Sequence, residues 1–228
     1  MNTALILFAG SGSRIHSELP KQFIKVKGVD MVVYTIKRFN DNPHIDEINL
    51  VTSKEFIPYV ECFKEKYGLE KINKVIEGGA TRQESVRLGL EALDYDDDDI
   101  ILIHDGDRPL VSHALINQAI DNLDEFDATC PYIDKDDVAT EVSNSGRRTG
   151  YEGKEVHVQT PQGFRFGLIK KLHIEKKDIE VNDDISFLSQ TEVKFYPGDK
   201  LNFKITLEQD LEYFKKLLEE YEKDFSEY

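Results

Sequence analysis

The sequence predicts an α/β fold, namely a Rossmann-like, mostly parallel sheet flanked by helices, with a β-arm that projects from it. Two observations predict the sheet. Short apolar runs alternate with helical stretches along the first half of the chain, which is typical of βαβ units. Glycine-rich or acidic turns follow the ends of several of these runs. A third observation predicts the arm, because the alternation stops between about residues 134 and 157.

The first strand is expected at residues 5–8, an apolar run that stops abruptly at the glycine loop 9–14. The elements that follow are a helix at 31–39, a strand at 47–51, a helix at 55–67, a strand at 74–77, a helix at 82–93 and a fully apolar strand at 100–103. In parallel sheets ligands bind at the carboxyl ends of the strands. The glycine loop, the Gly78-Gly79 turn and Asp105 are all expected at such ends, which is the first functional signal.

The segment 134–157 is interpreted as a hairpin arm that leaves the main sheet, because two turn-rich stretches flank a short β-like run within it. The elements expected here and beyond are a strand at 138–142, sheet-like runs at 156–159 and 194–196, and a closing amphipathic helix at 207–224. We find no internal repeat and no long linker. The chain is therefore expected to form a single domain over residues 1–228.

Composition limits the function. The chain has 228 residues, of which 39% are hydrophobic and 32% charged, as suits one globular α/β domain. A net charge of −15 argues against a nucleic-acid partner, since phosphate backbones favour a basic surface. No stretch approaches the roughly 20 apolar residues that cross a bilayer, and the start lacks a basic leader. We expect a soluble, cytoplasmic protein in which Cys62 and Cys130 are reduced and buried.

The glycine loop has the pattern of a phosphate-binding loop. It follows a strand and opens a helix, so that glycines would let backbone N–H groups approach anionic oxygens. It lacks the third glycine of a dinucleotide fingerprint, where Ile15 stands, and it lacks the Gly-Lys-Ser/Thr of a Walker loop. Arg14 and Lys21 bring two cations to the loop instead, which favours a triphosphate. Taken alone, the loop is equally compatible with an ordinary tight turn.

Several segments together resemble, in order, the signature of the sugar-alcohol-phosphate cytidylyltransferases. This family comprises the methylerythritol-phosphate enzymes of isoprenoid synthesis and the ribitol-phosphate enzymes of wall and capsule synthesis. The matching segments are AGSGSR at 9–14 with PKQF at 20–23, GGATRQESV at 78–86, HDGDRP at 104–109, QTPQGF at 159–164, NDD at 182–184 and NFKIT at 202–206. They extend over nearly the whole chain.

The resemblance implies a Mg²⁺-dependent enzyme that transfers CMP from CTP to a sugar-alcohol phosphate and releases pyrophosphate. By resemblance, the catalytic residues are Arg14, Lys21 and Lys204, and Asp105 holds the metal. The nucleotide-binding residues would be Ala9, Gly10, Ser11, Gly12, Ser13, Gly79, Ala80 and Ser85, and the substrate-binding residues Arg108, Thr160, Arg147, Arg148 and Asn182. The arm resembles a dimerisation arm that reaches into the partner's site, which implies a homodimer.

The sequence is also compatible with other functions and with other roles for individual residues. The resemblance favours 2-C-methyl-D-erythritol 4-phosphate as the acceptor, with ribitol 5-phosphate as the alternative, and a nucleotidyltransferase that uses another base is a further alternative. Two alternatives of another class are a catalytically idle nucleotide-binding module and a nicotinamide-dependent oxidoreductase. Simpler structural roles also compete at individual positions. Arg82 and Arg87 would decorate a helix, Asp107 would cap a turn, Asp183 and Asp184 would cap a helix near residue 185, and His104 would be a packed histidine.

Overall fold

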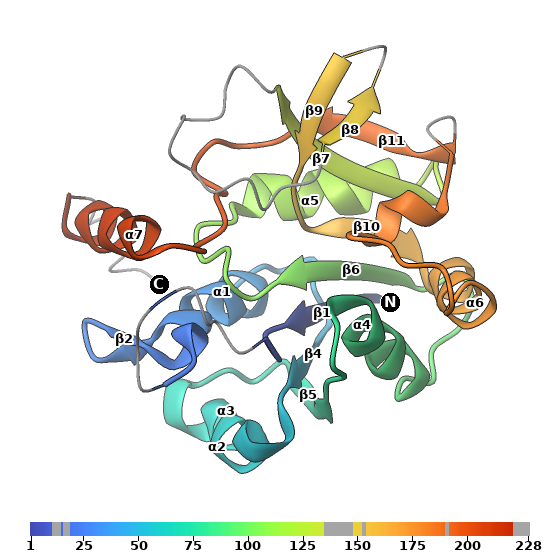
Figure 1. Ribbon diagram of the computed structural model, residues 1–228. Coiled ribbons are helices and arrows are strands. Elements are labelled where there is room, and N and C mark those ends of the chain that lie inside the picture. The colour runs from blue at the N-terminus through green and yellow to red at the C-terminus, as the bar shows by residue number, and fades with distance from the viewer. Residues whose placement is uncertain (11–14, 16–18, 135–147, 152–153, 190–191, 221–228) are drawn as a thin grey trace.

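The computed structural model describes residues 1–10, 15, 19–134, 148–151, 154–189 and 192–220. Within them, one sheet of nine strands runs in the order β5-β4-β1-β6-β10-β7-β9-β8, and β11 pairs with β7 (Figure 1). The strands are β1 (Asn2–Leu7), β4 (Glu47–Thr52), β5 (Ile72–Glu77), β6 (Ile100–Asp105), β7 (Ala128–Asp134), β8 (Arg148–Tyr151), β9 (Lys154–Val158), β10 (Gln162–Arg165) and β11 (Lys194–Pro197). A separate two-stranded sheet joins β2 (Lys25–Val26) to β3 (Val29–Asp30).

The sheet has two parts that differ in strand direction. β5, β4, β1 and β6 are parallel, whereas β10 runs antiparallel between β6 and β7. The described part of the predicted arm is the β8–β9 hairpin, which joins the sheet because β9 pairs with β7 (Ile133↔His157). The predicted hairpin is thus present in β8 and β9 and is joined to the sheet through the end of β7, whereas its role as a protruding arm stays a prediction. The strand expected at 138–142 lies outside the described residues.

Helices cover both faces of the sheet. Helices α1 (Met31–Asn40) and α5 (His113–Asn122) pack on one face, and α4 (Arg82–Glu91) and α6 (Phe166–Glu175) on the other. Alternation along β1 explains the two layers, because Ala4 and Ile6 join the first core and Leu5 and Leu7 the second. The predicted α/β fold, with a mostly parallel sheet flanked by helices, is confirmed.

A third apolar cluster fixes a loop that carries a predicted catalytic residue. Phe214 and Leu217 of helix α7 (Glu208–Glu220) pack in one buried cluster with Phe203, Ile205 and Met31. Phe203 and Ile205 flank Lys204 in sequence, so their burial anchors the backbone on both sides of that lysine. The helix expected at 207–224 thus corresponds to α7, and residues 221–228 lie outside the described chain.

Other expectations need correction. The helix expected at 55–67 is divided into a 3-10 turn η2 (Lys54–Phe56), α2 (Ile57–Glu61) and α3 (Phe63–Tyr67), which are separated at Cys62. Cys62 is exposed there, so the expectation that it is buried is wrong, whereas Cys130 is buried as expected. Helices α5 and α6 and strands β7 and β10 were not expected. No helix of the described residues is long and apolar enough to span a membrane.

A buried carboxylate joins several segments below the sheet. Asp30, which is 1% exposed, accepts hydrogen bonds from the hydroxyls of Tyr67 (2.6 Å) and Tyr59 (2.9 Å) and from the Lys25 ammonium (3.2 Å). This ties the β2–β3 hairpin to α2 and α3. Phe23, in the 3-10 turn η1 (Lys21–Phe23), stacks nearby on Phe56 with ring centroids 4.3 Å apart. The cluster thereby holds η1, the turn that begins with Lys21.

We predict that Asp30→Asn lowers the free energy of unfolding by about 1.5 to 3 kcal/mol, because it weakens the hydrogen bonds that a buried, ionised carboxylate accepts from two tyrosines and a lysine. Asp41→Asn is the matched control, since Asp41 is exposed and pairs with Lys37 at 3.0 Å. That surface pair is worth less than about 1 kcal/mol. Urea denaturation of both variants provides the measurement, and equal losses would contradict the role assigned to Asp30.

Candidate active site

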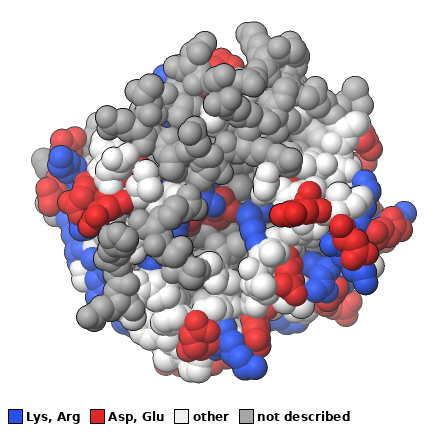
Figure 2. Space-filling view, in the orientation of Figure 1, with Lys and Arg blue, Asp and Glu red and all other residues white. Residues whose placement is uncertain are grey.

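A cavity of about 390 Å³ lies at the carboxyl ends of β1, β5 and β6. Its walls come from the end of β1, from η1, from the loop before α4 and from Asp105, Asp107 and Lys204. Figure 2 shows basic and acidic side chains side by side at the hollow near the middle of this face. The sequence predicts a site at these strand ends. Of the predicted site residues, the structure brings together at this cavity Ala9, Gly10, Lys21, Gly79, Ala80, Ser85, Asp105 and Lys204.

The carboxylate of Asp105, the last residue of β6, lies among three cations. Its Oδ1 accepts a hydrogen bond from Arg82 Nε (3.0 Å), and its Oδ2 accepts one from Lys204 Nζ (3.1 Å). Arg108 Nε lies 3.5 Å from Oδ2. Burial alone would raise the pKa of Asp105, but Lys204, Arg82 and Arg108 outweigh it and hold the pKa well below its usual range. Asp105 is therefore ionised at neutral pH.

A second carboxylate in the cavity belongs to Asp107. Lys21 Nζ donates to its Oδ2 (2.5 Å) and to the carbonyl oxygen of Ile205 (2.6 Å). Lys204 Nζ lies 3.7 Å from Oδ1 of Asp107, and this buried oxygen has no hydrogen-bond partner among the described residues. The two lysines outweigh burial and lower the pKa of Asp107. Asp107 thus pairs with cations of the site. The structural interpretation, in which Asp107 caps a turn, is therefore wrong.

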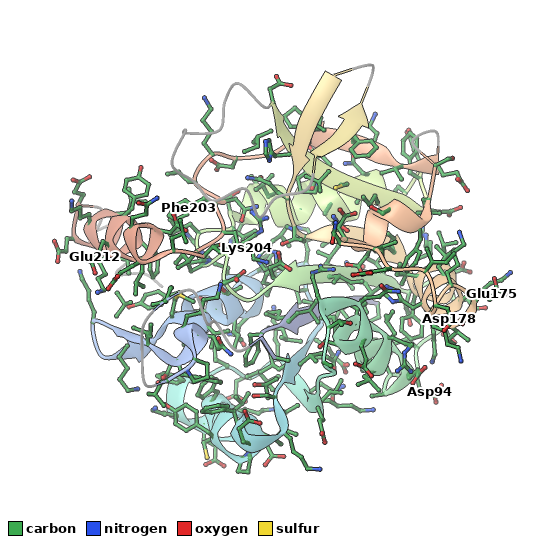
Figure 3. All side chains as sticks on the ribbon, viewed as in Figure 1. Asp94, Glu175, Asp178, Phe203, Lys204 and Glu212 are labelled. Atoms are coloured by element: carbon green, nitrogen blue, oxygen red, sulfur yellow. The ribbon has the colours of Figure 1, made fainter. Side chains whose placement is uncertain are left out.

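Lys204 reaches this site from far along the sequence. The N–H of Ile205 donates to the carbonyl oxygen of Asp107 (2.8 Å), which fastens the loop to the end of β6. In Figure 3 Lys204 lies near the middle of the molecule, whereas Glu175 and Asp178 lie at its edge. The ammonium thus contacts both carboxylates of the cavity.

A buried polar layer supports Asp105 from behind. The hydroxyl of Thr160 accepts a hydrogen bond from the backbone N–H of Asp105 (3.1 Å) and lies 3.0 Å from His104 Nδ1. His104 Nε2 lies 3.3 Å from the carbonyl oxygen of Arg108, which can only accept, so Nε2 carries the proton. Nδ1 must then accept from Thr160. Burial lowers the pKa of His104 to about 3, so the ring is neutral, and its interpretation as a packed histidine is confirmed.

Two predicted substrate ligands belong to this layer. Arg108 is 6% exposed and donates from Nη1 to the carbonyl oxygen of Asn202 (2.7 Å). Thr160 is 4% exposed, and its own carbonyl oxygen accepts from Asn202 Nδ2 (2.8 Å). Neither side chain lines the cavity among the residues that the structure describes there. Their contacts support Asp105, so a direct contact with substrate stays a prediction for both.

The loop before α4 forms the opposite wall. The backbone N–H of Gly79 donates to Ser85 Oγ (3.1 Å), and that of Ala80 donates to Glu84 Oε2 (2.7 Å). Thr81 caps α4 by accepting from the N–H of Glu84 (3.0 Å), so Glu84 is bonded both to the N-cap residue and, through its carboxylate, to the residue before it. The two N–H groups of the loop are therefore already bonded within the protein.

On the facing side of the cavity, Gln22 Nε2 donates to the carbonyl oxygens of Phe8 and Gly10, both at 2.8 Å. This fixes Ala9 and Gly10 at the cavity. The rest of the predicted glycine loop, with Ser11, Gly12, Ser13 and Arg14, lies outside the described residues. Arg147 does as well, and of Arg148 only the backbone, in β8, is described.

Asn182 lies elsewhere, in a neighbouring cavity of about 630 Å³. That cavity shares the Arg82 and Thr81 walls with the first one.

Arg82 is the residue that sequence reasoning missed, because it was interpreted as a surface decoration of α4. Its position as the first residue of a helix, at the carboxyl end of a strand, was the available signal. Arg87 does decorate the helix, since it pairs with Glu91 at 2.8 Å.

The charges of the site fit a divalent cation bound together with phosphate. The described residues hold no cluster of three or more metal-ligating side chains. Mg²⁺ commonly takes one or two carboxylates together with substrate phosphate oxygens and waters. Asp105 and Asp107 offer two ionised carboxylates, and the buried Oδ1 of Asp107 still lacks a hydrogen-bond partner within the described chain.

Cations that converge on carboxylates at the strand ends of a mostly parallel sheet are typical of sites that bind phosphates, and the comparisons with known proteins show that the class is that of the cytidylyltransferases. The sequence pattern of the 2-C-methyl-D-erythritol 4-phosphate cytidylyltransferase (IspD) family matches residues 3–220. The chain belongs to this family.

Individual relatives agree over nearly their whole length. An enzyme of that name from Clostridium novyi is 39% identical over 225 residues, covering 96% of this chain and 96% of that protein. One from Clostridium beijerinckii is 40% identical over 228 residues, covering 95% and 99%. The solved 4-diphosphocytidyl-2C-methyl-D-erythritol synthase of Anaerococcus prevotii superposes with a TM-score of 0.74 at 28% identity, covering 95% of each chain. The solved 2-C-methyl-D-erythritol 4-phosphate cytidylyltransferase of Thermus thermophilus gives a TM-score of 0.70 at 25% identity, covering 96% of this chain and 100% of that chain.

We predict that His104 makes stability depend on pH in weak acid. The pKa of His104 lies below the 6.5 of a free imidazole, so the unfolded chain binds the extra proton. The stabilisation is present above about pH 6.5 and is lost as the pH falls toward about 3, by at most about 1.4 kcal/mol per pH unit. The destabilisation caused by His104→Gln should therefore shrink as the pH falls. Urea denaturation from about pH 7 to about pH 5 measures this.

His44→Gln removes an exposed imidazole and serves as the control. A difference in unfolding free energy between the native protein and His104→Gln that stays constant over this pH range would contradict the prediction.

Proposed function

We propose that this protein transfers CMP from CTP to 2-C-methyl-D-erythritol 4-phosphate and releases pyrophosphate. The observation that carries this proposal is the meeting of Lys21, Arg82 and Lys204 with Asp105 and Asp107 at one cavity. Family membership supports the choice of nucleotide and acceptor. The cavity suits phosphates because the cations of Lys21, Arg82 and Lys204 line it at the strand ends.

In the proposed reaction a phosphate oxygen of the acceptor attacks the α-phosphorus of CTP. A new P–O bond forms, the bond from that phosphorus to the bridging oxygen of pyrophosphate breaks, and pyrophosphate leaves with the electron pair. Two anions must approach each other, so positioning and fixed positive charge should supply most of the acceleration. Lys21 and Lys204 are placed to provide that charge, since their ammonium groups meet at Asp107. Arg14, outside the described residues, is proposed to act with them.

Asp105 and Asp107 are proposed to hold Mg²⁺ through their carboxylates. When bound, Mg²⁺ supplies charge that polarises phosphate oxygens and offsets charge on the leaving group. The Lys204 ammonium, which bonds Asp105 here, would turn toward the phosphates. This exchange of partners requires only rotation of a lysine side chain that is 22% exposed.

The loop of Gly79 and Ala80, with Ser85, is proposed to bind the cytosine. Because the two loop N–H groups donate to Ser85 and Glu84, the base would meet the carbonyl oxygens of the loop, which can still accept even though that of Gly79 lies 3.4 Å from the Ser85 hydroxyl. Carbonyl oxygens would accept from the amino group of cytosine and would repel the carbonyl that uracil carries in its place. Glu84 therefore supports the choice of base indirectly.

A homodimer is proposed in which the arm at 134–157 reaches the partner's site. Arg147 or Arg148 would then bind the acceptor phosphate, together with Asn182 and, where rearrangement exposes them, Arg108 and Thr160. The support is the resemblance of the arm to the family's dimerisation arm. The described strands of the arm, β8 and β9, form the end of the sheet in Figure 1.

The test of the proposed function is pyrophosphate release from CTP and Mg²⁺ with 2-C-methyl-D-erythritol 4-phosphate and with ribitol 5-phosphate, assayed side by side. We expect release with the first acceptor at a clearly higher kcat/KM than with the second. A preference for ribitol 5-phosphate would overturn the acceptor assignment. No release with either acceptor would overturn the proposed function as a whole.

We further predict that Lys204→Ala lowers kcat by about 100- to 1000-fold, the usual effect of losing one donor to the charge that develops in a transition state. Lys21→Ala should behave similarly. Lys171→Ala is the control, because Lys171 is exposed and its nearest carboxylate, Glu175, lies 3.9 Å away. Steady-state rates measured on variants that remain folded at the assay temperature would support the roles, and a lowered melting temperature is expected because each lysine pairs with a buried carboxylate. A folded Lys204→Ala enzyme with near-normal kcat would refute the role of that lysine.

A further inference from the structure

A chain of polar side chains leads from α6 to Asp105. His173 Nε2 lies 3.0 Å from Asp184 Oδ1, and Arg82 Nη1 donates to Asp184 Oδ2 at 2.8 Å. Arg82 Nε then donates to Asp105 Oδ1 at 3.0 Å. His173 and Asp184 are each 1% exposed. The chain joins α6, the 3-10 turn η4 (Asp184–Phe187), α4 and β6, so it links four elements through side chains alone.

The position of Asp184 is fixed independently of Arg82. The backbone N–H of Ile185 donates to Gln162 Oε1 (3.0 Å), which fastens η4 to β10. Asp183 caps the same turn by accepting from the N–H of Ser186 (3.1 Å). The expectation that Asp183 caps this segment is therefore confirmed, whereas Asp184 turns inward to Arg82. A carboxylate held in this way can orient a flexible arginine.

Asp184 also changes the charge that Asp105 experiences. Lys204, Arg82 and Arg108 all lie within 3.5 Å of Asp105, which is more positive charge than one carboxylate needs. A divalent cation would be repelled by such an excess. Asp184 shares the guanidinium of Arg82, because a planar fork can serve two carboxylates where an ammonium would serve one. The sharing leaves the Asp105 carboxylate less neutralised.

We propose that Asp184, oriented by His173, is a positioning residue that shares the charge of Arg82 and thereby keeps the Asp105 carboxylate available to a divalent cation. This inference rests on the proposed function. It adds a role for residues that lie behind the cavity: Asp184 and His173 do not line it in the described structure. Arg82 is the residue through which both act.

The test is calorimetric titration of CTP into the protein, with and without Mg²⁺, for the native chain and for Asp184→Asn. We expect Asp184→Asn to lose the part of the CTP affinity that depends on Mg²⁺, by about 10- to 100-fold, as is usual when a partner behind a metal ligand is removed. CTP affinity without Mg²⁺ should be kept or increased, because the variant adds net positive charge beside the phosphates.

Asp178→Asn is the matched control, since it makes the same chemical change at an exposed residue of the neighbouring cavity and should leave both titrations unchanged. If Asp184→Asn does not fold, Arg82→Lys tests the same link, because a lysine keeps the charge but bonds one carboxylate. It should show the same selective loss. The inference is overturned if the folded variant keeps the native response to Mg²⁺, or if CTP affinity falls equally with and without Mg²⁺.

The Mg²⁺ concentration that gives half-maximal pyrophosphate release provides a second readout. It should rise by about the same factor in Asp184→Asn as the calorimetric affinity falls. Failure of the two proposals can be distinguished. A native protein that releases no pyrophosphate refutes the proposed function, whereas an active native protein with an unaltered Asp184→Asn variant refutes this inference alone.

Discussion

The carboxylate of Asp105, ionised among Arg82, Arg108 and Lys204, is the interaction on which the site depends. Burying this charge without partners would be costly, so the cations that surround it are also what allows it to lie at the floor of a cavity. Each cation comes from a different segment of the chain. The same contacts that stabilise the carboxylate therefore bring together the helix α4, the turn after β6 and the loop before α7.

The architecture follows from that need. Parallel strands place the end of β6 beside the end of β1, with Leu7 paired to Asp105, so Ala9 and Gly10 lie at the same edge as the carboxylate. The antiparallel strand β10 lies on the other side of β6 and brings Thr160 behind Asp105. The apolar face of α7 then anchors the loop of Lys204. Apolar packing thus fixes the positions of the charged side chains. In flexible loops these side chains would not hold one geometry.

Much of this could be predicted from the sequence because it is local. Apolar runs that stop at polar turns located β1, β4 and β6, and Asp105 with them, and motif resemblance located Lys21 and Lys204. Pairings between distant residues could not be predicted. Arg82 looks like a solvated helix residue until Asp184, 102 positions away, is placed beside it. Cys62 looks apolar, but its place between α2 and α3 exposes it. Strand β10 has only 4 residues, too few for alternation to show.

The central claim is that fixed cations organise a direct displacement at the α-phosphorus, with no side chain acting as a covalent nucleophile. Ser85, the serine of the described cavity wall, is bonded through its hydroxyl to backbone groups of Gly79 and Thr81. The most direct measurement is the stereochemical course of transfer from CTP made chiral at the α-phosphorus by one sulfur atom. The account predicts inversion of configuration at phosphorus. Retention would reveal two successive displacements through a covalent enzyme intermediate and would contradict it.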